Sequence, residues 1–202
     1  FIKLHKAYVI GVRLGGSDMC LRDRLYNIRA SCCKAIGQLD TAVKGYEKAL
    51  ALKPDYAEAH YNLGVTLREL GQIDAAIKSY KQALTIKPDY VGGHNNLGNI
   101  FLELSQLDAA ADHFEWAVAY KPDFAEAYNN LGIVCRERDK VHDAIKNFEK
   151  AIDIKPDYFQ AHSNLGHSLQ LINQMDAAVK CYEESLTINP NYALGYINIC
   201  LL

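Results

Sequence analysis

Residues 61–90 read YNLGVTLRELGQIDAAIKSYKQALTIKPDY, and this stretch decides the fold. Apolar residues recur at helical spacing along its first part: Tyr61, Leu63, Leu67 and Leu70. A break follows at Gly71–Gln72, and a second helical stripe then extends from Ile73 to Ile86 before Pro88. The stretch therefore predicts two helices that are joined by a short turn.

The same pattern returns along the chain at a fixed step of 34 residues. The five prolines are Pro54, Pro88, Pro122, Pro156 and Pro190. Other columns keep this step: Ala42, Ala76, Ala110, Ala144 and Ala178; Leu63, Leu97, Leu131, Leu165 and Ile199; Gly64, Gly98, Gly132 and Gly166; Tyr46, Tyr80, Phe114, Phe148 and Tyr182. A period of this length is typical of a solenoid, in which each hairpin buries its apolar face only by stacking on its neighbours.

Two local features support the hairpin. Small residues such as Gly64 and Ala76 are expected where the two helices cross, because larger side chains would push the axes beyond about 8–10 Å. Asp55 and Asp123, each with a glutamate three residues on, are expected to cap the helices that follow them.

On these columns the chain resembles the tetratricopeptide repeat (TPR) family, over residues 23–190 and a partial sixth repeat. The nearest resemblance is to the TPR arm of O-linked N-acetylglucosamine transferases, and similar arrays precede bacterial glycosyltransferase- and sulfotransferase-like domains. The resemblance implies an all-α, right-handed superhelix whose concave groove is lined by the first helix of each repeat. The expected organisation is a non-repeat lead-in or improvised cap at 1–22, then repeats at 23–56, 57–90, 91–124, 125–158 and 159–192, and a truncated first helix at 193–202.

The first repeat departs from the pattern. Arg29 stands where leucine is expected, and Ala30 replaces the glycine. Tyr26–Asn27 would match Tyr61–Asn62 only if the helix held one extra residue. Since the chain starts without Met and stops inside a repeat, we expect it to be part of a longer protein.

Composition limits the possible partners. Half of the 202 residues are apolar, and the net charge is −2, with acids and bases spread along the chain. This argues against nucleic acid or an anionic membrane as the main partner, because both call for a basic patch. No apolar run is long enough to cross a bilayer, and the first residues lack a convincing signal peptide. The six cysteines match no zinc or redox spacing, so we expect buried free thiols in a reducing compartment, the cytoplasm.

The main candidate site is a column of asparagines, one residue before the leucine column. We call Asn62, Asn96, Asn130, Asn164 and Asn198 the asparagine ladder. Asparagine is a poor residue for the middle of a helix, so a function is expected there. The resemblance implies that this column faces the concave groove, where a similar ladder in related transferase arms holds the main chain of a peptide.

The chemistry of an amide suits that role, because one side chain offers both donor and acceptor to any peptide group. With first helices about 10 Å apart and about 3.3 Å per extended residue, four steps would hold about a dozen residues. The alternative is that the ladder bonds neighbouring repeats and only holds the stack together. Further groove candidates, each of which can also be an ordinary solvated residue, are Tyr61, Asn95, Asn129, Asn99, Arg68 and Arg136.

Several activities find no support in the sequence. TPR domains that grip the acidic C-terminal tails of chaperones use Lys or Arg at set groove positions, and the matching positions here hold Glu58, Gly92, Glu126 and Gln160 instead. His60, His94 and His162 share a column, but no acidic or thiol partner lies at ligand spacing, so packed histidines are expected, not a metal site. No catalytic constellation and no cofactor motif is apparent.

Trp116 is an anomaly, since its column otherwise holds Lys48, Gln82, Lys150 and Glu184. An exposed aromatic at this position suggests a second contact or a self-association patch, against the alternative of an unremarkable surface residue.

Three functions remain open at this stage. The first is a protein-interaction scaffold that binds an extended peptide, the second is the substrate-recruiting arm of a larger transferase, and the third is a structural or oligomerisation element. Oligomeric state is not predicted.

Overall fold

The computed structural model describes residues 16–200, which form helices and turns with no strand among them. The helices are α2 (Gly16–Ala35), α3 (Leu39–Leu52), α4 (Ala57–Glu69), α5 (Ile73–Ile86), α6 (Val91–Glu103), α7 (Leu107–Tyr120), α8 (Ala125–Glu137), α9 (Val141–Ile154), α10 (Phe159–Leu171), α11 (Met175–Ile188) and α12 (Ala193–Cys200). Most of the expected lead-in, residues 1–15, lies outside the described residues, and α2 begins inside its last part.

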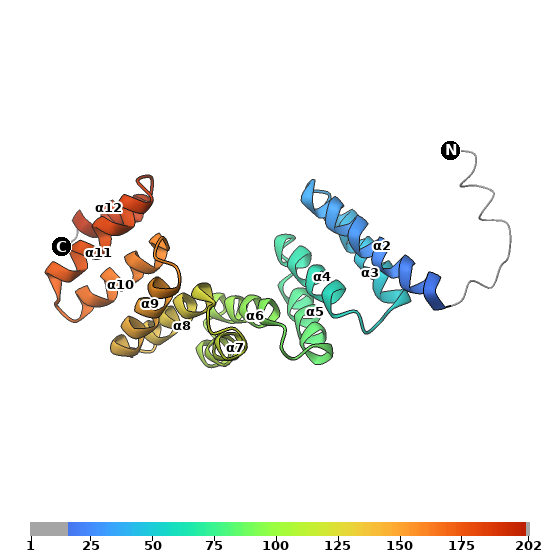
Figure 1. The fold of residues 1–202 in the computed structure, drawn as a ribbon, viewed down its shortest axis with the longest axis horizontal. Coiled ribbons are helices and arrows are strands. Elements are labelled where there is room, and N and C mark those ends of the chain that lie inside the picture. Colours follow the sequence, from blue (N-terminus) through green and yellow to red (C-terminus); the bar gives the residue numbers. More distant parts are fainter. Residues whose placement is uncertain (1–15, 201–202) are drawn as a thin grey trace. The chain divides into compact units, whose positions relative to one another are not determined.

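Consecutive helices pair as hairpins, α2 with α3 and so on to α10 with α11, and α12 follows alone (Figure 1). The chain divides into two compact units, residues 1–87 and residues 88–202. Within each unit, one hairpin packs on the next, as α3 does on α4 and α9 on α10. The fold is the predicted all-α solenoid of stacked hairpins.

The turn inside each hairpin places one residue in the left-handed region. These residues are Gly37 (φ 76°), Gly71 (φ 73°), Ser105 (φ 57°), Asp139 (φ 59°) and Asn173 (φ 62°), again one every 34 residues. Glycine adopts this conformation without steric strain and Asn and Asp tolerate it in turns, whereas serine is less suited to it. The first two repeats use glycine there and the next three do not.

The glycine column is required by an aromatic ring of the same hairpin. A Cβ atom at Gly64 would lie 2.8 Å from Cε1 of Tyr80, and one at Gly132 would lie 2.6 Å from Cε1 of Phe148. Both rings are fully buried. The small column thus allows the first helix to rest directly on the aromatic side chain of the second.

The first hairpin solves the same packing problem in reverse. Ala30 replaces the glycine on α2, and a Cβ at Gly45 on α3 would lie 2.8 Å from Cβ of Ala30. In this hairpin the glycine at the close contact lies on the second helix, and the first helix carries alanine. Asn27 occupies the place of Asn95 and Asn129 in the 34-residue register and accepts a hydrogen bond from Asn62, as Asn95 does from Asn130 and Asn129 from Asn164.

Two further expectations are corrected by the structure. Asp55 and Asp123 do not cap helices: the N-cap residues are Tyr56 and Phe124, and neither forms a side-chain capping bond. The thiols Cys32, Cys33, Cys135, Cys181 and Cys200 are free as expected, but Cys32 and Cys200 are exposed and the other three half-buried. Burial raises the pKa of the Cys181 thiol to about 11, which keeps it protonated and unreactive at neutral pH.

Candidate functional site

The asparagine ladder lies on the first helix of successive hairpins. Asn62 is on α4 in the first unit, and Asn96, Asn130, Asn164 and Asn198 are on α6, α8, α10 and α12 in the second. All five are half-buried. Each side chain therefore reaches both a neighbouring helix and solvent.

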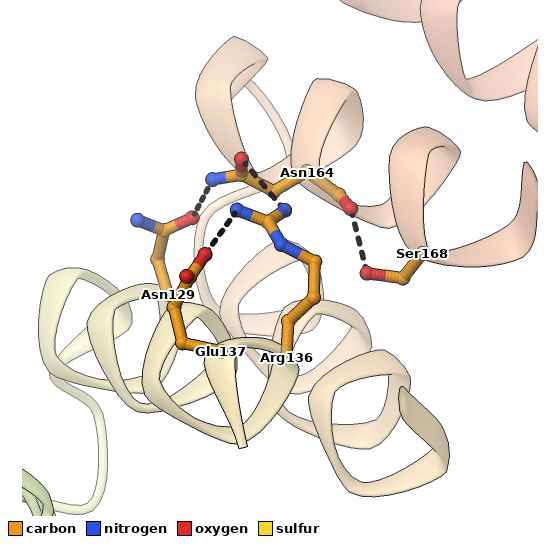
Figure 2. A network of polar contacts seen from close by, with 5 residues as sticks. All are labelled: Asn129, Arg136, Glu137, Asn164 and Ser168. Carbon is orange, nitrogen blue, oxygen red and sulfur yellow. Dashed lines mark hydrogen bonds and ion pairs between the residues drawn. The ribbon is translucent and has the colours of Figure 1, made fainter. Parts of the chain in front are cut away.

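Ladder amides bond to the preceding repeat in a regular way. The Nδ2 group donates to the side chain 35 residues earlier: Asn62 to Oδ1 of Asn27 (3.3 Å), Asn130 to Oδ1 of Asn95 (3.3 Å), Asn164 to Oδ1 of Asn129 (2.9 Å) and Asn198 to Oγ of Ser163 (3.4 Å). Figure 2 shows the bond between Asn164 and Asn129. The ladder thus joins first helices of consecutive repeats, which was the structural alternative for this column.

These bonds leave specific atoms of the ladder for a ligand. Asn130 commits both amide hydrogens, to Asn95 and to Oδ1 of Asn99 (2.9 Å), while its Oδ1 accepts from Asn129 (3.4 Å). An amide oxygen has two lone pairs, so Oδ1 of Asn130 retains one. The acceptor side of this rung is therefore open to a peptide N–H, and the donor side holds the stack together.

Arg136 extends the ladder toward the end of α8. One of its nitrogens lies 3.5 Å from Oδ1 of Asn164 and another lies 3.9 Å from Glu137 (Figure 2). The guanidinium also lies over the ring of Phe148. Burial is the main factor that lowers the pKa of Arg136, and it also lowers that of His167, which Arg136 depresses further. The guanidinium is a fixed, partly desolvated cation beside the ladder.

A polar depression of about 460 Å³ lies at the ladder in the second unit. Its lining combines α6, α8, the loop between α9 and α10, and the start of α10: Asn95, Asn99, Glu126, Asn130, Lys155, Asp157, Tyr158, Phe159 and Gln160. Burial, with a smaller contribution from Glu126, raises the pKa of Tyr158 to about 12, so its hydroxyl remains a donor. Donors, acceptors and both signs of charge thus meet in one open hollow.

Of the other predicted groove residues, four lie in the second unit and two in the first. Asn95 and Asn129 are buried and serve as acceptors for the next ladder residue, whereas Asn99 and Arg136 are half-buried. Tyr61 and Arg68 lie half-buried on α4 in the first unit, and the ring of Tyr61 packs at 5.8 Å from that of Tyr80.

Sequence reasoning missed Tyr158 as a lining residue. A signal was present, because Tyr56, Tyr90, Phe124, Tyr158 and Tyr192 form an aromatic column directly after each Pro-Asp or Pro-Asn pair. It also missed the role of the histidine column, in which Nε2 of His60, His94 and His162 each donates to the carbonyl of the proline six residues earlier (2.9 Å in each case). Those histidines fasten the loop before each first helix.

Trp116 lies on α7 and is exposed, at 52 % of its surface. It is a second-helix residue and does not line the polar depression. The structure therefore does not bring it together with the ladder.

Comparison with known proteins agrees with this geometry. The TPR repeat pattern matches residues 33–67 and 66–105, and tetratricopeptide repeat patterns match 95–159 and 159–192. The chain belongs to the tetratricopeptide repeat family, and its fold is that of a protein-interaction scaffold. No curated protein matches the chain.

Solved structures of the same fold are numerous. MamA is 27 % identical, with a TM-score of 0.74 over 82 % of this chain and 96 % of its own. PilF of Pseudomonas aeruginosa is 20 % identical, with a TM-score of 0.81 over 90 % of this chain and 82 % of its own. YrrB, described as a TPR protein with an unusual peptide-binding site, is 21 % identical, with a TM-score of 0.72 over 85 % of this chain and 89 % of its own.

Two searches of the described residues bear on other classes of site. None of their helices is long and apolar enough to cross a membrane. No group of three or more His, Cys, Asp or Glu side chains among them is arranged to hold a metal ion.

Proposed function

We propose that this chain binds an extended peptide segment of a partner protein along the first helices of the second unit. The peptide lies over the polar depression and is held by the asparagine ladder, chiefly Asn130. The chain acts by binding, and it needs no cofactor for this role.

The observation that carries this proposal is the open acceptor of Asn130 inside the depression. Because its amide hydrogens are bonded within the protein, Oδ1 is aimed by those bonds and does not have to be ordered when a ligand binds. A peptide N–H is the natural partner of such an oxygen, whatever the peptide's sequence. Tyr158 and Lys155, which line the same depression, supply donors for peptide carbonyls.

The expected affinity is modest. A net hydrogen bond contributes about 0.5–1.5 kcal/mol, and first helices about 10 Å apart meet about every third residue of an extended chain. The second unit offers Asn96, Asn130, Asn164 and Asn198, so about nine residues of peptide would be engaged. Selectivity then depends on side chains such as Glu126, Arg136 and His167.

The TPR fold is able to hold a peptide, as YrrB illustrates by having a peptide-binding site. The mixed charges of the depression favour a polar segment over a strongly acidic tail, because Glu126 and Asp157 line it beside Lys155. We therefore propose a partner other than an acidic chaperone tail. The free thiols suit a reducing compartment such as the cytoplasm.

The test starts from a phage-displayed library of random 12-residue peptides selected on the wild-type chain. Affinities of the selected peptides are then measured by calorimetry for the wild type and for an Asn96→Ala/Asn130→Ala double variant. We expect the double variant to weaken binding about tenfold or more, from the loss of two bonds. Side-chain amide signals of the ladder in a ¹H–¹⁵N spectrum should shift when peptide is added.

The matched control is Asn147→Ala, which removes a half-buried asparagine from the second helix α9, away from the depression. It should leave peptide affinity unchanged. If the double variant melts normally and binds the selected peptides as tightly as the wild type, the ladder serves only to join repeats and the proposal is wrong.

A further inference from the structure

One face of α7 differs from its counterparts in the other repeats at three positions. Asp112 stands where the sister helices carry Lys44, Lys78, Lys146 and Lys180. Trp116 replaces Lys, Gln or Glu, and Tyr120 replaces Leu or Ile. The three residues are four apart, so they lie along the same side of the helix. A basic or polar stripe has become an acidic and aromatic one in this repeat alone.

The aromatic rings of this face stack on each other and on a buried histidine of α6. The rings of Trp116 and Tyr120 are stacked, with centroids 5.5 Å apart and planes 18° apart. His94 of α6 stacks against both, at 6.0 Å and 6.4 Å. His94 is buried and is itself fixed by its bond to the carbonyl of Pro88. Trp116 and Tyr120 remain 52 % and 44 % exposed, so a preordered aromatic surface faces solvent.

The acidic part adjoins the tryptophan. Asp112, Glu115, Trp116 and Ala119 line one depression of about 340 Å³. Both carboxylates are exposed, and within residues 16–200 neither forms an ion pair or a hydrogen bond. No Lys or Arg occurs in α7, and Lys121, which follows it, holds its Nζ 5.2 Å from the ring of Phe124. The negative charge beside Trp116 is therefore not neutralised by a cation of its own helix or by Lys121.

We propose that this face of α7 is a second binding site, which takes a basic segment of a partner protein. An Arg or Lys side chain lies on the exposed face of Trp116 and pairs with Asp112 and Glu115. Cations bind well over indole rings, and carboxylates at the rim align and strengthen that contact. A purely apolar partner is disfavoured because it would desolvate two carboxylates. The second unit as a whole supports this choice of ligand, since it carries 8 Lys and Arg against 16 Asp and Glu.

This site is separate from the ladder, because it lies on a second helix and shares no residue with the polar depression. Its ligand also differs, since the ladder recognises main chain and this face recognises positive charge. The two proposals can therefore fail independently.

The chain provides its own probe, because Trp116 is its single tryptophan. The ligand used is a peptide of three Gly-Ser-Arg units, with peptides of Gly-Ser-Gln and Gly-Ser-Glu as controls, in low salt. We expect the arginine peptide to change tryptophan emission in a saturable way and the two controls to leave it unchanged. If the arginine peptide has no effect, the proposal is overturned.

A matched pair of charge reversals tests the location. Glu115→Lys and Glu149→Lys change the net charge equally at the same position of sister helices, but only Glu115 adjoins Trp116. By calorimetry, Glu115→Lys should weaken binding about tenfold and Glu149→Lys by less than about twofold. Trp116→Gln, which installs the residue of a sister repeat, should weaken binding about three- to fivefold.

Three outcomes would contradict the proposal. Equal weakening by Glu115→Lys and Glu149→Lys would show general charge attraction and no site. Loss of binding in Asn96→Ala/Asn130→Ala would place the basic peptide on the ladder. Sedimentation showing self-association that Trp116→Gln abolishes would make a second copy of this chain the occupant.

Discussion

The two units share one fold and carry opposite charge. Residues 1–87 hold 14 Lys and Arg against 8 Asp and Glu, and residues 88–202 hold 8 against 16. The net charge of −2 conceals this division, so the sequence-based view of evenly spread charge is wrong. Each unit keeps the same alanine, leucine and aromatic columns. The comparison teaches that the buried columns determine the hairpin, whereas the exposed positions can vary and so determine whether a unit attracts an acidic or a basic partner.

The units also differ in how they form the turn inside the hairpin. The first unit uses Gly37 and Gly71 in the left-handed conformation, and the second uses Ser105, Asp139 and Asn173. Glycine avoids steric strain but loses more conformational entropy on folding. The same turn is therefore obtained with different balances of strain and entropy.

The largest expected effect tests whether the two cores are equivalent. Gly64→Val in the first unit and Gly132→Val in the second would each force a branched side chain into a buried ring, Tyr80 or Phe148. Overpacking of this kind costs about 1–3 kcal/mol, so both variants should lower the urea midpoint by similar amounts. Urea unfolding followed by circular dichroism at 222 nm measures this midpoint.

The first hairpin supplies the control for that experiment. Gly45→Val should also be costly there, because its Cβ would lie 2.8 Å from Cβ of Ala30. A much milder effect of Gly64→Val than of Gly132→Val would show that the two cores are not packed alike.

A smaller effect is expected from exchanging turn residues. Ser105→Gly should stabilise the second unit by about 0.5–1 kcal/mol. A non-glycine residue in the left-handed region costs about 1–2 kcal/mol, and part of the gain from removing this strain is offset because glycine loses more conformational entropy on folding. Gly71→Ser should destabilise the first unit by a similar amount. Urea unfolding of the paired variants gives both values, and the same sign in both would refute the strain argument.

The 34-residue columns predicted the fold because each is a packing requirement that recurs. Gly132 must be small because Phe148 lies on it, and such a rule is visible in sequence. The direction of the ladder amides could not be predicted, because Asn130 can bond inward or outward and only the position of Asn95 and Asn99 decides. The caps at Tyr56 and Phe124 were missed because local propensity favoured Asp55 and Asp123.

Acid should weaken the second unit through His94. Burial lowers the pKa of His94. Its Nδ1 accepts a hydrogen bond from Nδ1 of His113 at 3.0 Å, so a proton added to Nδ1 of His94 would point at the N–H of His113. Below a pH of about 6.5 the unfolded chain takes up a proton that the folded His94 resists, so stability present above that pH is lost as pH falls. The urea midpoint should decrease from pH 7.5 to 5.5.

His94→Gln should flatten this pH dependence. The control is His60→Gln in the first unit, where the equivalent histidine bonds the carbonyl of Pro54 and where Ser79 stands at the register position of His113. A pH dependence that His94→Gln leaves unchanged would assign the effect to other groups, of which His167 is the first candidate because its pKa is also lowered.

The smallest effect expected concerns the opposite charges themselves. In low salt, poly-glutamate should shift backbone amide signals of the first unit, and an oligo-lysine those of the second, because each polymer concentrates near charge of the opposite sign. Both sets of shifts should fade as salt rises toward about 1 M, where the Debye length is about 3 Å. Glu115→Lys should reduce the oligo-lysine shifts around α7 more than Glu149→Lys does, since only Glu115 adjoins Trp116. Shifts spread equally over both units would mean that the division of charge along the sequence does not create separate surfaces, and the contrast between the units would then lie only in their turns.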